Sequence, residues 1–165
     1  MDPPALAFSL PSELPLGLSV RSIEMEFERL IAKTWKTLHI FSFSHTTTMA
    51  FELNATMLAV LKNVRPNIHI YTNDKSTAER LHAMFSRVAS SVEVFYWTKQ
   101  NSSFHIKSIV VDRKDVYLGS ANFSISALRE NAEAGLFFES ESIAESLIEY
   151  ADVLMAAGLL VPLEG

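Results

Sequence analysis

Cysteine is absent from this chain of 165 residues. Its absence excludes disulfides, thiol catalysis and cysteine-based zinc sites, although a protein without thiols persists in either redox compartment. The sequence also lacks the residue spacings of zinc and calcium sites, a phosphate-binding glycine loop and the G-x-S-x-G motif of serine hydrolases. We therefore expect chemistry that uses no metal and no other cofactor.

Long apolar runs are missing as well. No stretch is long and apolar enough to span a bilayer, and residues 1–20 contain four prolines and no lysine or arginine, unlike a signal peptide. These features predict an extended segment over residues 1–20 and a cytoplasmic protein without a membrane anchor. The net charge of −5 does not favour general affinity for nucleic acid, but net charge does not describe the charge of a local cleft.

The length and the 48% hydrophobic content predict one domain with a sizeable core. Apolar residues at helical spacing predict four helices, three of which Ser22, Asp74 and Ser140 are placed to cap. Short apolar segments bounded by turn residues predict six strands. The expected helices cover residues 23–31, 49–64, 75–88 and 141–154, and the expected strands cover residues 38–43, 67–71, 92–96, 105–111, 116–118 and 132–138.

The order of these segments predicts an α/β fold for residues 21–165. Alternating strands and helices in the first half imply parallel strands with helical crossovers. The tight turn at residues 112–115 then adds an antiparallel hairpin. The expected result is a single domain with a mixed β-sheet flanked by helices on both faces.

The most informative pattern lies between residues 105 and 133. His105, Lys107 and Asp112 form the pattern H-x-K-x4-D, which is followed by Gly119-Ser120-Ala121-Asn122 and then by Asn131-Ala132-Glu133. A chain of this composition would contain H-x-K-x4-D together with G-S-x-N at this offset by chance on the order of once in a million sequences. The combination therefore indicates a site.

The residue types in this pattern suit a phosphodiester. Alternation along a strand that begins at His105 places His105 and Lys107 on one face, where the imidazole can attack phosphorus while the ammonium holds a nonbridging oxygen. Ser120 and Asn122 follow the next strand and can donate hydrogen bonds to the other phosphate oxygens. Glu133, at the start of its strand, is placed to accept from the Nδ1–H of a histidine and so to fix its tautomer.

Asp112 has a structural role in this interpretation. It follows Lys107 by five residues, which along a strand is a distance of about 15 Å, so we expect it to stabilise the hairpin turn. His39 and His69 lie within apolar strands and favour a structural role as well. His45 follows the first strand, where α/β proteins collect site residues, and the sequence leaves open whether it lines the site.

The H-x-K-x4-D pattern with its downstream G-S-x-N segment and acidic residue resembles the signature of the phospholipase D superfamily. The resemblance implies a half of the phospholipase D fold, and a reaction through a phosphohistidine intermediate without a metal. The family usually carries two copies of the motif, so that one histidine attacks phosphorus and the other protonates the leaving oxygen. This chain carries one copy, and in-line displacement needs the two groups on opposite sides of the phosphorus.

The single copy is similar to the small members of the family, which are homodimeric and mostly nucleases. The resemblance thus implies a homodimer that cleaves DNA or RNA, with defence against foreign DNA as one possible role. Trp97 and the polar residues 98–103 lead into the motif and either contact a nucleic-acid strand or form an ordinary loop. Two other functions stay open: a lipid phosphodiester hydrolase of the phospholipase D type, and a subunit that binds nucleic acid without cleaving it.

Overall fold

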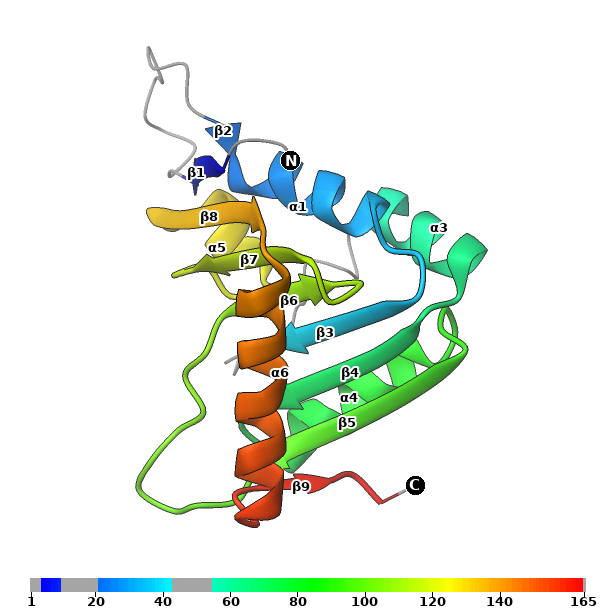
Figure 1. Cartoon of the computed structure of the whole chain (residues 1–165), viewed down its shortest axis with the longest axis vertical. Helices are drawn as coiled ribbons and strands as arrows, with labels where there is room; N and C mark the ends of the chain where they lie inside the picture. The colour runs from blue at the N-terminus through cyan, green and yellow to red at the C-terminus, as the bar shows by residue number, and fades with distance from the viewer. Residues whose placement is uncertain (1–3, 10–20, 43–54, 165) are drawn as a thin grey trace.

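The computed structural model describes residues 4–9, 21–42 and 55–164, which form one mixed sheet with helices on both faces (Figure 1). The strand order is β2-β1-β8-β7-β6-β3-β4-β5-β9. The strands are β1 (Ala5–Ser9), β2 (Arg21–Ser22), β3 (Thr37–Phe41), β4 (Asn67–Thr72), β5 (Ser91–Trp97), β6 (Ser108–Val111), β7 (Asp115–Gly119), β8 (Glu133–Glu139) and β9 (Leu160–Pro162).

The described helices are α1 (Ile23–Ala32), α3 (Ala55–Val64), α4 (Lys75–Phe85), α5 (Ile125–Arg129) and α6 (Glu141–Ala156). Strands β3, β4 and β5 are parallel, with α3 and α4 in the connections. Strands β6, β7 and β8 then add three antiparallel pairings. The predicted α/β fold is therefore confirmed, while residues 49–54 of the helix predicted at 49–64 lie outside the described residues.

Two apolar clusters occupy the two faces of the sheet. The predicted buried stripe of α1, which includes Phe27 and Ile31, packs with residues of α3, α4 and α5 on one face. Helix α6 lies alone across the other face among the described helices (Figure 1), and its Ala144, Ile148 and Ala151 pack with residues of β3, β4, β6 and β7. The expectation of helices on both faces is thus correct.

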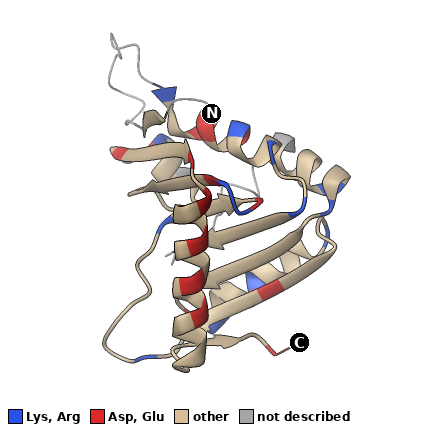
Figure 2. Ribbon diagram, in the orientation of Figure 1, with Lys and Arg blue, Asp and Glu red and all other residues tan. Residues whose placement is uncertain are grey.

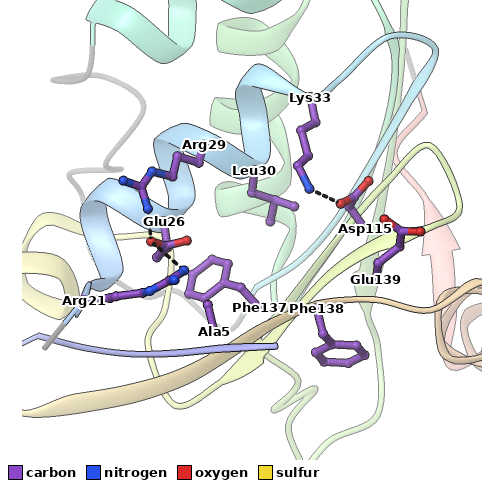
Figure 3. Close-up of a pocket in the computed structure, with 10 residues that line it drawn as sticks. All are labelled: Ala5, Arg21, Glu26, Arg29, Leu30, Lys33, Asp115, Phe137, Phe138 and Glu139. Carbon is purple, nitrogen blue, oxygen red and sulfur yellow. Dashed lines mark hydrogen bonds and ion pairs between the residues drawn. The ribbon is translucent and has the colours of Figure 1, made fainter. Parts of the chain in front are cut away.

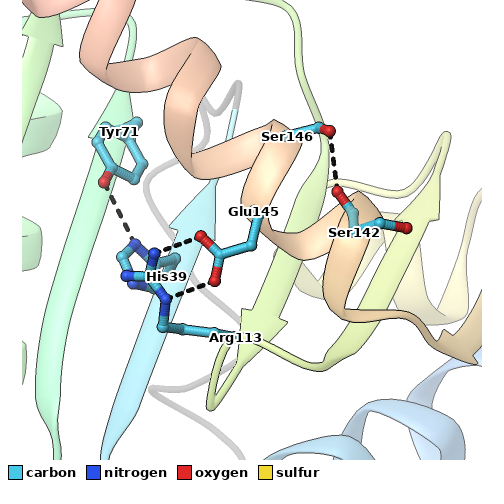
Figure 4. A network of polar contacts seen from close by, with 6 residues as sticks. All are labelled: His39, Tyr71, Arg113, Ser142, Glu145 and Ser146. Atoms are coloured by element: carbon cyan, nitrogen blue, oxygen red, sulfur yellow. Dashed lines mark hydrogen bonds and ion pairs between the residues drawn. The ribbon is translucent and has the colours of Figure 1, made fainter.

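A polar network lies beneath α6 (Figure 4). His39 of β3 is buried, its Nδ1 lies 3.3 Å from the hydroxyl of Tyr71, and its ring stacks on His69 of β4. Burial is the main cause that lowers the pKa of His39 to about 3, with His69 and Arg113 acting in the same direction and Glu145 against them. The neutral ring is part of the core, as the sequence predicts for His39.

Two of the three predicted helix caps form. The side chains of Asp74 and Ser140 accept hydrogen bonds from main-chain N–H groups in the first turns of α4 and α6. Ser22 occupies the cap position of α1, but its side chain makes no capping hydrogen bond.

The strand predicted at residues 105–111 begins at Ser108, which corrects the prediction for His105. Ser108 pairs with Phe41, the last residue of β3. Residues 105–107 thus lie before the first paired residue of β6, beyond the described end of β3. Short elements that the pattern did not predict are α5, the strand β1 and the edge strands β2 and β9.

Asp112 lies at the opposite end of β6 from His105, in the turn before β7. Its φ angle of 50° is in the left-handed region, which Asp tolerates better than most residues. Its carboxylate accepts hydrogen bonds from the N–H groups of Trp35, Lys36 and Thr37 at 2.7 to 2.8 Å. Asp112 therefore connects the hairpin to the start of β3, in addition to occupying the predicted turn.

We predict that Asp112→Ala lowers the melting temperature by several degrees. The change leaves three N–H groups without their acceptor, for about 1–3 kcal/mol, and one kcal/mol corresponds to about 2–4 °C in a domain of this size. Thermal unfolding of Asp112→Asn is the comparison and should show a smaller loss, because its one carbonyl can still accept from Lys36 and Thr37 but not also from Trp35, and Asn tolerates the left-handed region. Equal melting of Asp112→Ala and the unchanged protein would refute the assignment.

Candidate active site

The predicted site residues gather at the carboxyl edge of β3, β4 and β5. Residues 105–107 lie there because Ser108 pairs with the last residue of β3. β7 ends at the same edge, since its Leu118 pairs with Ser108, and β8 begins there, since its Gly135 pairs with Gly119. Open α/β sheets place ligands at this edge.

His105 and Lys107 lie in direct contact. The Nζ of Lys107 is 3.1 Å from both ring nitrogens of His105, so the ammonium lies against the imidazole. His105 is exposed, whereas Lys107 is partly buried. The two side chains therefore lie together, as the sequence predicts, although both residues precede the strand.

Glu133 belongs to the same cluster. Its carboxylate accepts hydrogen bonds from the hydroxyl of Ser120 and from the side-chain amide of Asn131, at 3.2 Å in the second case. Partial burial is the larger influence on the Lys107 ammonium and lowers its pKa from the ordinary value, while Glu133 raises it. Glu133 therefore accepts a hydrogen bond from Ser120 and favours the charged form of Lys107. A hydrogen bond from a histidine to Glu133 stays a prediction.

Tyr117 holds the segment that carries Ser120 and Asn122. Its hydroxyl accepts from the N–H of Ala121 at 3.1 Å and donates to the carbonyl of the same residue at 3.2 Å. The phenol is buried and packs edge-on against Phe27, with ring centroids 4.5 Å apart. Tyr117 is not among the predicted site residues, because an aromatic residue in an apolar strand has the same sequence pattern as any other core residue.

Two glycines make room for this ring. A Cβ on Gly135 would lie 2.3 Å from the Cε2 atom of Tyr117, and one on Gly119 would lie 2.4 Å from its hydroxyl oxygen. Gly119 and Gly135 are cross-strand partners in β7 and β8. The glycine of the G-S-x-N segment is thus required by the ring of Tyr117.

Asn122 is partly buried, and its Oδ1 atom is buried with no hydrogen-bond partner among the described residues. Its carbonyl accepts from the N–H of Ser124, which caps α5 through its side chain. The structure thus places Asn122 between the Tyr117 contact and a capped helix. His45, which the sequence left open, lies outside the described residues.

A pocket of about 220 Å³ lies away from this edge (Figure 3). It includes Asp115, at the other end of β7 from Ser120, and Glu26, which pairs with Arg21 and Arg29. None of the predicted site residues lines it; its lining is Ala5, Arg21, Glu26, Arg29, Leu30, Lys33, Asp115, Phe137, Phe138 and Glu139.

Acidic side chains are spread along α6 (Figure 2), whose sequence contains three glutamates and one aspartate after Ser140 and no lysine or arginine. Within the described ranges, histidine and acidic side chains form no group of three or more that could hold a metal ion. Among these same residues, no helix combines the length and apolar character that a membrane crossing needs.

Comparisons with known proteins identify similar sequences and similar folds. The family model described as "Cardiolipin synthase, PLD-like domain" matches residues 27–155. Proteins named phospholipase D from Rickettsia prowazekii (strain Madrid E) and Rickettsia typhi (strain ATCC VR-144 / Wilmington) are 42% and 40% identical over 45 residues. Each of these matches covers 27% of this chain and 22% of the relative, so the chain spans only part of their length.

Solved structures share the fold over nearly the whole chain. Nuc from Salmonella typhimurium, a phospholipase D family member, has a TM-score of 0.68 at 17% identity, covering 99% of this chain and 100% of Nuc. NucT from Helicobacter pylori has a TM-score of 0.60 at 18% identity, covering 84% and 89% of the two chains. Phosphatidylserine synthase from Haemophilus influenzae Rd KW20 has a TM-score of 0.68 at 17% identity, covering 96% of this chain and 39% of the synthase.

We predict that Tyr117→Phe loosens the segment around Ala121. The change removes the hydroxyl that serves both main-chain groups of a buried residue, which costs about 1–3 kcal/mol. Hydrogen exchange should become faster at residues 119–123, with a melting temperature lowered by a few degrees. Tyr150→Phe on the exposed side of α6 is the matched control. Unchanged exchange at Ala121 would show that the hydroxyl does not hold this segment.

Proposed function

Because this chain belongs to the phospholipase D superfamily, we propose that it is a phosphodiesterase that cleaves DNA or RNA at a site shared by two chains. The observation that carries the proposal is the contact between His105 and Lys107 at the carboxyl edge of the sheet, 3.1 Å from Nζ to each ring nitrogen. Ser120 and Glu133 complete the cluster from the ends of the two adjacent strands. Nucleophile, cation and hydrogen-bond donors thus converge on one exposed edge.

The proposed reaction has two steps. A ring nitrogen of His105 attacks phosphorus, and the bond to the leaving oxygen breaks as a second histidine gives that oxygen a proton. The second histidine then takes a proton from water, and the water oxygen displaces His105 from phosphorus. Lys107, Ser120 and Asn122 hold the nonbridging oxygens in both steps. Because Lys107 supplies the positive charge, we propose that the reaction needs no divalent metal.

The second histidine comes from another copy of the chain in this proposal. One H-x-K pattern is present, and a single imidazole cannot attack and protonate from opposite sides of the phosphorus. His39 lies buried beneath α6, and His69 stacks on it and pairs with Glu93, so both are engaged in the sheet. A symmetric homodimer brings His105 of each copy to the same phosphodiester.

Charge supports approach of the substrate from the carboxyl edge. The face that α6 covers carries acidic side chains and no lysine or arginine on that helix, which disfavours a polyanion there. At the edge, Lys107 is accessible in part and His105 is exposed. A nucleic-acid strand that crosses the edge can place a phosphate on His105 and its flanking bases against Trp97, the last residue of β5, and the loop that follows it.

A lipid phosphodiester is the second candidate substrate. The curated relatives are named phospholipase D, and one structure with the same fold is a phosphatidylserine synthase. Both substrates present the same phosphodiester to His105, so the assay must contain both. We favour nucleic acid because the described residues include no basic amphipathic helix that would hold a membrane surface.

We predict that His105→Asn abolishes cleavage and leaves binding of the substrate largely intact. Asparagine is close to histidine in size but cannot form a phospho-enzyme, so the rate should fall at least about a thousandfold. Labelled DNA, labelled RNA and phosphatidylcholine vesicles are incubated with each protein, with EDTA or with magnesium. Cleavage of a nucleic acid in EDTA is the expected result for the unchanged protein.

Lys107→Ala is the comparison variant, because loss of its charge-assisted contact should weaken binding and rate together. Near-normal cleavage by His105→Asn would refute the mechanism. Cleavage that requires magnesium would refute the metal-independent step. Turnover of the vesicles alone would replace nucleic acid with lipid as the substrate.

We also predict that a mixed dimer with one His105→Asn chain is inactive. A shared site loses either its nucleophile or its acid when one of its two histidines is replaced. Two differently tagged chains are co-expressed, purified through both tags and assayed beside each homodimer. If each chain contained a complete site, the mixed dimer would keep about half of the normal rate, and an active monomer in light scattering would contradict the dimer itself.

A further inference from the structure

We infer that Asn73 is a positioning residue for His105, which it orients through the main chain of Phe104. The side-chain oxygen of Asn73 accepts from the N–H of Phe104 at 2.7 Å, and its amide nitrogen donates to the carbonyl of Phe104 at 2.7 Å. The inference rests on the proposed function, because it gives Asn73 a role only if the direction of the His105 ring matters for a reaction.

The two hydrogen bonds fix the peptide next to the nucleophile. The carbonyl that Asn73 binds belongs to the peptide group that joins Phe104 to His105. With the N–H on the other side also held, rotation of the main chain at Phe104 would break at least one bond. Because a planar peptide leads directly into the Cα of His105, its orientation sets the direction in which the imidazole leaves the chain.

Asn73 itself stands on a rigid support. It follows Thr72, the last residue of β4, which is paired with Tyr96 of β5. The next residue, Asp74, caps α4 and accepts from the N–H of Thr77 at 2.9 Å and from its hydroxyl. Because Asn73 lies between a central strand and a capped helix, its position is fixed by both elements. The main chain at Phe104 is therefore positioned by Asn73, and not the reverse.

His105 needs this support because it lies outside the sheet. β6 begins at Ser108, and just before it the carbonyl of Lys107 accepts from the N–H of Gly119 at 3.3 Å. On the other side, the ring of Phe104 is buried and stacks near Phe41. Burial fixes the position of the Phe104 side chain, and the two hydrogen bonds of Asn73 fix the orientation of its peptide groups.

The test uses Asn73→Ala and Asn73→Asp, with Asn67→Ala as the matched control. Aspartate has the same shape and still accepts from the N–H of Phe104, but it cannot donate to the carbonyl when ionised. Asn67 lies at the other end of β4, and its side chain accepts a hydrogen bond from the hydroxyl of Ser91. Because Asn73→Asp leaves no cavity, it keeps the test valid if Asn73→Ala does not fold.

Three quantities are measured for each protein. The kcat and KM are measured with bis(p-nitrophenyl) phosphate and with labelled DNA, at a temperature well below the melting transition of every variant. The ring C–H signals of His105 are followed by NMR and assigned by their loss in His105→Asn. We expect both Asn73 variants to lose at least about tenfold in kcat with little change in KM, since small misplacement of a reacting group slows chemistry strongly.

The His105 ring signals should shift or broaden in both Asn73 variants and stay unchanged in Asn67→Ala. Normal kcat and unaltered His105 signals in either Asn73 variant would overturn the inference. Equal losses in Asn67→Ala would also overturn it, because they would reflect general weakening of β4. If the unchanged protein cleaves none of the phosphodiesters, the proposed function fails, and altered His105 signals would still establish that Asn73 orients the ring.

Discussion

The register of four strands determines where the site can form. Ser108 pairs with Phe41 on one side and with Leu118 on the other, and Gly119 pairs with Gly135. The ends of β3 and β7 and the starts of β6 and β8 therefore lie at one edge of the sheet. A slip of one residue in any of these pairings would turn the side chains of that strand to the opposite face, and the cluster of His105, Lys107, Ser120 and Glu133 would not assemble.

Beyond the strand ends, side chains form hydrogen bonds with main-chain groups, as a neighbouring strand does within the sheet. Tyr117 binds both main-chain groups of Ala121, and Asn73 binds both main-chain groups of Phe104. Each contact satisfies one buried or partly buried peptide donor and acceptor that no neighbouring strand reaches. The site stays exposed at the sheet edge, while these side-chain hydrogen bonds hold the main chain on either side of it.

Patterns of apolar residues predicted the order of the main elements, because each helix or strand buries one face over several residues. They failed at short strands such as β1 and at α5, where few residues carry the signal. The motif predicted that His105 and Lys107 lie together, but it placed them inside a strand that begins only at Ser108. Asn73 and the N–H partners of Asp112 could not be predicted, because a hydrogen bond to a main-chain atom far away in the sequence leaves no local residue pattern, unlike a helix cap.

A site shared between two chains places a particular demand on each half. Association already costs translational and rotational freedom, so any further ordering of catalytic groups on contact would weaken the assembled site. In this fold the ordering is present within one chain: Lys107 lies against the His105 ring, and Glu133 holds Ser120. The two contacts to main-chain atoms fix the segments that carry these groups. In the proposed dimer, each half therefore meets its partner with its proposed reacting groups already in place, which is the condition under which proximity accelerates a reaction most.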